Sequence, residues 1–436
     1  MRRFHALARV SRLAYEGGMS SPSASALKSA AVDRALEHLD AQNEAIAART
    51  EAWSAINSGS YELDGLTRMR ALIVEACGAL PAKPELAALA PTQRVRPDGE
   101  TDPVEHGASV RVRVRPDAPI QIALTGHYDT VFSAKHAFQK PWRAEADTML
   151  GPGVADMKGG IAVMLAALET FEAMPGEKRV GYEVLLSPDE EIGSPASAAL
   201  LAELGKRAQL GMTYEPAMAE GALVSSRKGS GNFSLVLRGQ AAHVGRAFTD
   251  GRSAVIAAAE AAVMLNELNG QHEGVTFNVG AIDGGGPNNI VPDKAVLRFN
   301  VRAPDEASVG WAMDHVRCVC DHAGNRDGIK AYLHGGISRP PKPVTPPQQI
   351  MMDWVKSAAS VAGFAASFMP SGGVCEGNNL AAAGCPNIDT LGPCGGNLHS
   401  DQEFVRISSF AERAKLSLLL LAGVNDGAFD VKELRK

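Results

Sequence analysis

The chain has 436 residues, of which 45% are hydrophobic and 21% charged, and its formal net charge at pH 7 is −6. That length is sufficient for two domains, and the hydrophobic content supports a sizeable core. The acidic balance leaves no basic surface for a nucleic-acid partner. The 6 cysteines are scattered without a CxxC pair, which is typical of a reducing compartment, so we expect a cytoplasmic protein.

Residues 1–24 are expected to be a leader outside the fold. They carry 4 arginines and no acidic residue before Glu16, and Arg9 and Arg12 interrupt the apolar run that a secretory signal needs. A transit-like presequence and a true start at Met19 both remain open. No run of about 18 apolar residues occurs anywhere, so we expect a soluble protein without a membrane partner.

The following residues, 25–224, predict an α/β layer. Apolar residues at helical spacing predict a long helix over 24–52 and another over 66–80. The polar stretch 91–106 contains Pro and Gly and predicts a loop, whereas the strict alternation in 110–115 predicts an edge or partly exposed strand. Strand-like and helical segments then alternate, which predicts a doubly wound, mostly parallel sheet.

Potential metal ligands follow several of these strand-like segments. Listed in chain order, they are His127, Asp129, Asp156, Asp189, Glu190, Glu191 and Glu215. Open parallel sheets bind ligands at the carboxyl ends of their strands. A single His or a single acidic run at such a place is usually a surface or packing residue. Because potential ligands recur at four strand-like segments, however, the sequence predicts a metal site. The spacing of His127 and Asp129 puts both on one side of an extended chain, where the carboxylate can orient the imidazole.

The order of the predicted strands and helices changes after residue 224. Residues 225–338 read as strand, helix, strand, strand, helix, strand, which is the split βαβ pattern of a ferredoxin-like sheet with two helices on one face. A proline-rich return segment follows, and 339–436 resume the α/β pattern. We therefore expect an α/β catalytic domain, a doubly wound and mostly parallel sheet formed by 25–224 and 339–436, that is interrupted by an inserted domain.

Five ordered motifs resemble one enzyme family. They are GHYDTV, GVADMKGG, SPDEEIGS, YEP and GGNLHSDQEF, within residues 25–425. They are similar to the metal-site motifs of the co-catalytic zinc amidohydrolases and peptidases, which include glutamate carboxypeptidase, acetylornithine deacetylase, succinyl-diaminopimelate desuccinylase and the aminoacylases. The glutamate carboxypeptidase branch is the closest in pattern.

The resemblance implies two divalent metal ions per chain, most simply Zn²⁺, with Co²⁺ or Mn²⁺ also compatible. One ion would take His127 and Glu215, the other Glu191 and His399, and Asp156 would bridge them, which leaves each ion an open position. A water held between the ions would be the nucleophile. The resemblance further assigns Glu190 as general base and Asp129 as the residue that orients His127. No role is assigned to Asp189, which we expect to be a solvated carboxylate in a loop.

The resemblance also implies a homodimer. The inserted domain is the dimerisation domain in relatives, and His243 in QAAHVG resembles a residue that donates a hydrogen bond to the oxyanion in the neighbour's site. Asn289, Arg339 and, more weakly, Arg302 resemble residues that hold the carboxylate or backbone of the substrate. Arg302 is equally consistent with a surface position. Relatives often carry Thr-Asp or Ser-Asp near the position where this chain has Cys375-Glu376, so no single relative's substrate transfers directly.

Three functions compete on this sequence. The first is hydrolysis of an amide bond, either a C-terminal peptide bond or an N-acyl group, in a small amino-acid derivative. The second is a non-catalytic relative that binds such molecules, which would lack a ligand or Glu190, and none is missing. The third is a nucleotide-binding protein, but the glycines around 151–160 form neither GxxxxGK[ST] nor GxGxxG, and Asp156 would repel phosphate.

Overall fold

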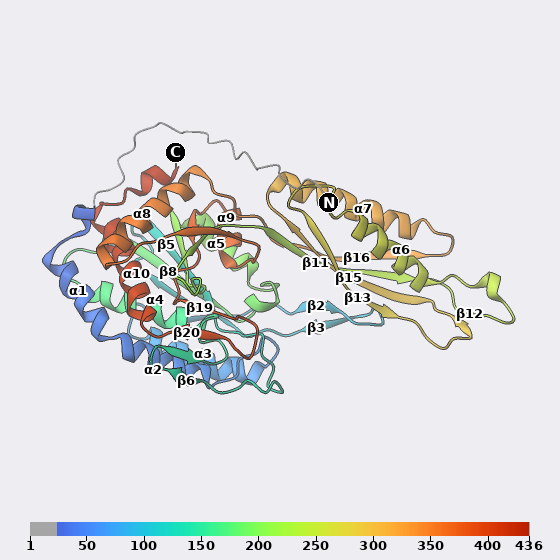
Figure 1. Ribbon diagram of the computed structural model, residues 1–436, viewed down its shortest axis with the longest axis horizontal. Helices are drawn as coiled ribbons and strands as arrows, with labels where there is room; N and C mark the ends of the chain where they lie inside the picture. Colours follow the sequence, from blue (N-terminus) through green and yellow to red (C-terminus); the bar gives the residue numbers. More distant parts are fainter. Residues whose placement is uncertain (1–23, 436) are drawn as a thin grey trace, which may run out of the picture.

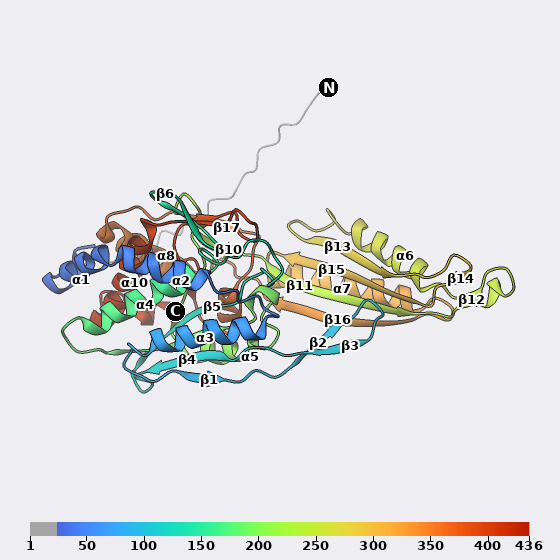
Figure 2. The ribbon, with the colours of Figure 1, turned by 90° about the horizontal axis from the view of Figure 1, so that it is seen from below.

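The computed structural model describes residues 24–435, so the expected leader lies almost entirely outside the described residues. Figures 1 and 2 show two units side by side along the long axis of the molecule. We call residues 229–339 the inserted unit and the rest of the described chain the larger unit. No helix in the described part of the chain combines the length and apolar character that crossing a bilayer requires.

A six-stranded sheet organises the larger unit. Its strands, in spatial order, are β1 (Glu85–Ala87), β4 (Ser109–Val114), β8 (Val180–Ser187), β5 (Ile120–His127), β9 (Leu210–Thr213) and β18 (Asn387–Ile388). β8, β5, β9 and β18 are parallel, whereas β4 runs antiparallel to both of its neighbours. The expected mostly parallel sheet is confirmed. β4 is partly exposed as predicted, but β1 pairs with its outer side, so β4 is not the edge.

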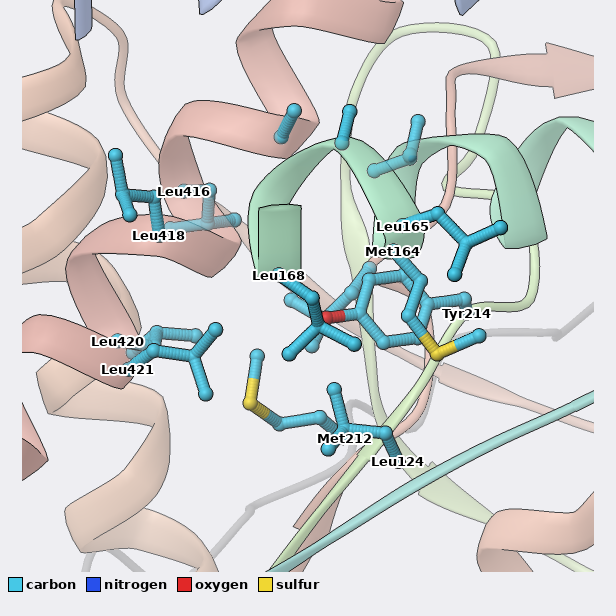
Figure 3. Packing of buried hydrophobic residues seen from close by; sticks show 14 of the residues in the cluster. Leu124, Met164, Leu165, Leu168, Met212, Tyr214, Leu416, Leu418, Leu420 and Leu421 are labelled. Atoms are coloured by element: carbon cyan, nitrogen blue, oxygen red, sulfur yellow. The ribbon is translucent and has the colours of Figure 1, made fainter. Parts of the chain in front are cut away.

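Helices cover both faces of this sheet. On one face lie α1 (Ala30–Ala41), α2 (Asn43–Ser54), α3 (Leu63–Cys77), α4 (Lys158–Ala173), α8 (Pro346–Ala362) and α10 (Ser409–Asp426), and on the other α5 (Ala198–Arg207) and α9 (Glu376–Ala382). Figure 3 shows the leucines of α4 and α10 converging above Leu124 and Met212 of the sheet. β8 is buried on both faces, which explains the consecutive apolar residues 184–186 within it.

Two predictions for the first hundred residues need correction. The long helix expected over 24–52 is divided into a 3-10 turn η1 (Ala24–Leu27), α1 and α2. The Ser29 side chain caps Val32 N, so α1 begins at Ala30, and the helix closes at Gln42, whose N–H bonds back to His38 and Leu39.

The loop expected over 91–106 is a hairpin of β2 (Thr92–Val95) and β3 (Thr101–Val104). Its Gly99 has a φ of +78°, a conformation that glycine adopts without steric cost. The two strands are short, and the Pro and Gly residues in and between them are typical of a loop. The sequence pattern therefore did not indicate that the strands pair.

The inserted unit has the predicted split βαβ order. Its elements are β11 (Gly229–Arg238), α6 (Ala254–Glu267), β13 (Thr276–Gly284), β15 (Lys294–Ala303), α7 (Glu306–Gly324) and β16 (Lys330–Arg339). The antiparallel sheet has the order β13-β15-β11-β16, and both helices pack on one face around a separate core. β12 (Ala242–His243) pairs with β14 (Ile290–Val291) at the end of this unit farthest from the larger unit.

The larger unit also contains two smaller sheets. One has the order β19 (Gly395–Gly396), β20 (Phe404–Arg406), β7 (Thr148–Leu150) and β6 (Trp142–Glu145), and the other pairs β10 (Leu223–Arg227) with β17 (Phe368–Ser371). The remaining elements are the 3-10 turns η2 (Glu190–Ile192), η3 (Phe248–Asp250) and η4 (Val431–Arg435). The pairing of β20 with β7 places two loops side by side, residues 151–156 and 397–403.

We predict that Leu168→Ala lowers the free energy of unfolding by about 2–5 kcal/mol, because Leu168 is completely buried between α10 and the sheet and its truncation leaves a cavity. Urea denaturation followed by circular dichroism measures this change. The matched control is Leu63→Ala, at a position that is 42% exposed, which should change stability by less than about 0.5 kcal/mol. Equal effects of the two variants would contradict the assigned packing.

Candidate metal centre

His127 and Asp129 lie at the carboxyl end of β5 and are both buried. The Nδ1 atom of His127 lies 3.1 Å from the Asp129 carbonyl oxygen and 3.3 Å from its carboxylate oxygen Oδ1. Asp129 also accepts hydrogen bonds from the backbone N–H groups of Glu190 and Glu191, at 3.1 Å each, and from Ser60 Oγ at 2.7 Å. Asp129 therefore orients the imidazole and fixes the turn after β8 at the same time.

Asp156 lies between the two imidazoles. Its Oδ1 is 3.1 Å from His127 Nε2, and its Oδ2 is 3.3 Å from His399 Nε2. His399 Nε2 is also 3.1 Å from a carboxylate oxygen of Glu191, and His127 Nε2 is 3.7 Å from one of Glu215. One carboxylate that faces two separate histidine–glutamate pairs has the arrangement of a ligand that bridges two metal ions.

His399 is presented by an unusual backbone conformation. Its φ is +62° and that of Asn397 is +54°, a region that residues other than glycine seldom adopt. Ser400 Oγ donates to the Asn397 carbonyl at 2.7 Å and helps to hold the turn. Such backbone conformations cluster at functional sites, where surrounding contacts hold them in place.

Without metal ions, the cluster favours the protonated forms of its glutamates and of its imidazoles. Burial and the nearby charge of Asp156 raise the pKa of Glu191 to about 8 and that of Glu215 well above its usual value. Burial opposes ionisation of Asp156, but hydrogen bonds from His127 and His399 hold its pKa below the usual range. Hydrogen bonds to Asp156 and Glu191 raise the pKa of His399 to about 11. Divalent cations remove this conflict, because they favour the ionised carboxylates.

The donor set itself fits two ions. Among the described residues, two groups have ligand atoms within 4.8 Å of one another, one of His127, Asp156 and Glu191 and one of His127, Glu190 and Glu215. Imidazole nitrogens and carboxylate oxygens together suit Zn²⁺, Co²⁺ and Mn²⁺. His399 belongs to neither group, but its Nε2 lies 3.3 Å from Asp156 and 3.1 Å from Glu191, so all five residues expected as ligands lie in one cluster.

Glu190 and Arg339 meet at the edge of this cluster. Glu190 Oε2 lies 4.0 Å from His127 Nε2, and its Oε1 accepts a hydrogen bond from Arg339 Nη2 at 2.7 Å. The same guanidinium donates to Ser194 Oγ at 2.8 Å and to the Asn379 side chain. Arg339, expected to hold substrate, therefore lies buried against the candidate base.

Three expected site residues lie away from the cluster. His243 and Asn289 are exposed on the β12–β14 pair at the far end of the inserted unit, where Val244 N donates to Asn289 O at 3.0 Å. Arg302, on β15, donates through Nε to Asn300 at 3.0 Å and through Nη1 to Gly372 O at 3.4 Å. Neither His243 nor Asn289 reaches the metal centre of its own chain.

The solvated position expected for Asp189 is wrong. Its side chain is completely buried and accepts hydrogen bonds from Ala196 N at 2.8 Å, Ser197 N at 3.1 Å and Ser197 Oγ at 2.5 Å. Burial raises the pKa of this carboxyl group. Asp189 therefore closes the turn that leads into α5, a role that depends on backbone groups folded back onto it.

Cys375 and Glu376, the pair at which the resemblance suggested a departure from relatives, are also buried. The Cys375 sulfur accepts a hydrogen bond from Gly377 N at 3.3 Å as the N-cap of α9. Glu376 accepts one from Ser187 Oγ at the end of β8. Gly373 and Val374, just before this pair, border a cavity beside the metal cluster.

Sequence reasoning missed Arg227, which borders a cavity of about 380 Å³ together with Glu191, Glu215 and His399. Its guanidinium donates to both oxygens of the buried Asp389, at 2.8 and 3.1 Å. Lys342 Nζ also donates to Asp389, at 2.6 Å. Because these three residues lie far apart in the chain, no local motif could reveal the group.

Glu403 was also missed, although it lies inside the last of the five motifs. It is 1% exposed and accepts hydrogen bonds from the N–H groups of the turn that carries Asp156. The signal available in the sequence was its position four residues after His399. An acidic residue in a polar loop is ordinarily solvated, so this signal alone was weak.

Comparison with known proteins decides the family. A model described as peptidase family M20/M25/M40 matches residues 123–422. The chain belongs to this family. Its members are metallohydrolases of peptide and N-acyl amino-acid bonds, and membership implies a dinuclear metal site, for which the ligands described above are present.

Individual relatives are distant. The chain is 28% identical to carboxypeptidase G2 of Pseudomonas sp. (strain RS-16) over 314 residues, which cover 70% of this chain and 74% of the relative. It is 28% identical to succinyl-diaminopimelate desuccinylase of Bordetella pertussis over 293 residues, 63% of this chain and 75% of the relative. An M20 family metallo-carboxypeptidase from Sulfolobus solfataricus shares the fold, with a TM-score of 0.66 at 16% identity over 86% of this chain and 97% of its own.

We predict that the metal-free protein loses thermal stability as the pH rises from about 5 to 7. The raised pKa values of Glu191 (about 8) and Glu403 (about 7) mean that the folded state binds more protons than the unfolded chain in this window, and the raised pKa of His399 (about 11) adds to this difference only above about pH 6.5. Lys158, whose pKa burial lowers to about 7, opposes this trend only above that pH.

Differential scanning calorimetry after chelation measures this trend. Added Zn²⁺ should raise Tm more at pH 7 than at pH 5, because its ligands must lose protons. A metal-free Tm that rises between pH 5 and 7 would show that the cluster does not carry excess negative charge.

Proposed function

We propose that this protein is a two-metal hydrolase that cleaves an amide bond, a C-terminal peptide bond or an N-acyl group, in a small amino-acid derivative. The observation that carries the proposal is the position of Asp156 between His127 and His399, each of which has its own glutamate. A binding protein without catalysis is the alternative. It would not require Glu190, which lies beside the cluster and is held in one orientation.

We propose Zn²⁺ as the bound metal, with Co²⁺ and Mn²⁺ as alternatives that the same donors accept. His127 and Glu215 would hold one ion, Glu191 and His399 the other, and Asp156 both. When bound, the two ions would polarise the scissile carbonyl group and lower the pKa of a water molecule at the site.

Glu190 is proposed to move the proton. Arg339 holds Oε1 of Glu190, at 2.7 Å, so that Oε2 is directed to the cluster, 4.0 Å from His127 Nε2. From that position Glu190 can accept a proton from the attacking water and return it to the leaving amine. Asp129 keeps His127 in a fixed orientation during both steps.

We propose that the cavity of about 380 Å³ receives one flank of the substrate. Arg227 lines it, and only its Nε and Nη2 donate to Asp389, so Nη1 is available to a carboxylate. Arg302 donates to the carbonyl oxygen of Gly372 at 3.4 Å, next to Gly373, which lines the cavity. A substrate with a carboxylate group fits this placement, and its acyl group and amino acid are left open.

We also propose a homodimer. His243 and Asn289 are exposed far from their own metal centre, and Phe248, 65% exposed, and Val244, 38% exposed, lie beside them. A second copy that received this end of the inserted unit would obtain from His243 a hydrogen-bond donor for the oxyanion. Symmetric pairing of two inserted units would also cover an open sheet edge. The lack of any disulfide among the described cysteines is compatible with the cytoplasmic location that we propose.

We predict that Glu190→Gln retains both metal ions and loses about 100- to 10,000-fold in kcat, because the amide cannot accept the proton. A screen of N-acyl amino acids and dipeptides supplies the substrate, and elemental analysis counts the metal. Glu203→Gln, an exposed position on α5, is the control and should keep full activity. A Glu190→Gln enzyme with a normal rate would require another base.

We predict that mixing two inactive variants restores activity. His243→Ala alone should lower kcat by about 100- to 1000-fold with little change in KM. In a heterodimer with a Glu190→Gln chain, one site contains both changes and the other none. After full exchange of a 1:1 mixture, about half of the dimers are heterodimers, so about a quarter of all sites in the mixture should be intact. Demonstrated subunit exchange without recovery would place the action of His243 within its own chain.

A further inference from the structure

Glu403 is a buried carboxylate that contacts the backbone of the turn preceding the bridging ligand. Its Oε1 accepts hydrogen bonds from Ala155 N at 2.9 Å and Asp156 N at 3.0 Å, and its Oε2 accepts one from Gly153 N at 2.9 Å. In addition, Gly151 N donates to the backbone oxygen of Glu403 at 3.2 Å. One residue therefore satisfies four N–H groups within a single turn.

Glu403 is equally connected to the other metal-bearing turn. Its backbone N–H donates to Ser400 O at 3.2 Å, in the turn that begins with His399. The next residue, Phe404, pairs with Leu150 at the start of the β20–β7 ladder. The ladder sets the position of Glu403, and Glu403 then links the turn of His399 to that of Asp156.

We infer that Glu403 is a positioning residue that sets the bridging carboxylate and thereby both halves of the metal centre. Asp156 is the residue whose two oxygens face both imidazoles, so a shift of its turn changes both sets of ligands. His399 or Glu215, in contrast, contributes to one set. This inference rests on the two-metal centre proposed above.

The energetics favour a specific role over general packing. Burying a carboxylate is costly unless charge-assisted hydrogen bonds offset the loss of hydration. Neutral backbone N–H groups provide part of that offset here. Partners of metal ligands that act in this way typically affect metal affinity by about 10- to 100-fold.

A second anchor allows Glu403 to be changed without melting the turn. Lys158 is completely buried and its Nζ donates to Ile56 O at 2.7 Å and Trp53 O at 3.2 Å, at the end of α2. Its backbone N–H donates to Gly153 O at 2.9 Å. The turn therefore remains attached to α2 when Glu403 is substituted, and only the fine position of Asp156 should change.

The test is a Zn²⁺ titration of the metal-stripped full chain against a chromophoric chelator. Glu403→Gln retains the size of the side chain but replaces one of its two acceptor oxygens with an NH₂ group. The remaining oxygen can accept from only one part of the turn, and the NH₂ group faces backbone N–H donors at the other part. We expect both Zn²⁺ binding steps to weaken by about 10- to 100-fold, with a metal-free Tm close to that of the wild type. Glu403→Asp, which keeps the charge but is one methylene shorter, should retain intermediate affinity.

Two controls make the result specific. Asp401→Asn changes an exposed carboxylate of the same loop, whose side chain contacts Gln402, and should leave both steps unchanged. His399→Ala removes one ligand and should weaken chiefly one step. Substituting Co²⁺ adds a spectroscopic signature, since its visible spectrum should change in Glu403→Gln for both ions.

Several results would overturn the inference. Wild-type affinity at both steps in Glu403→Gln, or a loss confined to one step as in His399→Ala, would show that Glu403 does not act through Asp156. If Glu403→Gln is unfolded without metal while Glu403→Asp is folded with wild-type affinities, the role is structural only. If the wild type itself binds fewer than two ions, the proposed centre fails, and this inference fails with it.

Discussion

The repulsion among carboxylates around Asp156 is the constraint on which the rest of the structure depends. Asp156, Glu191 and Glu215 contact two imidazoles in a largely buried space, and burial there raises the pKa of both glutamates. Such a cluster is unfavourable on its own and becomes favourable around divalent cations. The parallel sheet serves this arrangement because neighbouring strand ends bring acidic turns together without a long loop.

A layer of buried carboxylates holds these turns in place. Asp129 accepts from the N–H groups of the 190–191 turn, Asp189 from those that lead into α5, and Glu403 from those around Asp156. Each uses neutral backbone donors. Cationic partners in these positions would compete electrostatically with the metal ions, whereas N–H dipoles fix the geometry and leave the negative charge of the ligands intact. Two arginines also lie at the site: Arg339 contacts Glu190, the carboxylate expected to carry a proton instead of a metal ion, and Arg227, paired with Asp389, borders the cavity.

The side chains that cluster here could be picked out from the sequence because they lie in short motifs at or near strand ends; His127, for example, is the last residue of β5. Local patterns also predicted the split order of the inserted unit. They failed where the partner is distant in the chain. Asp189 looks solvated until the turn around Ser197 closes on it, and Arg227 and Asp389 lie 162 positions apart. The destination that we propose for His243 depends on a second chain, which no periodicity within one chain can reveal.

Arg339 also explains why the two units cannot be considered independently. It is the last residue of β16, so its backbone belongs to the inserted sheet, yet its guanidinium holds the candidate base of the larger unit. The β2–β3 hairpin makes a second connection, since Val95 packs against Val236 and Val296 of that sheet. A rotation of the inserted unit about its two chain connections would therefore move Arg339 relative to Glu190. The orientation of the base depends on the same rigid-body position that determines where His243 is presented.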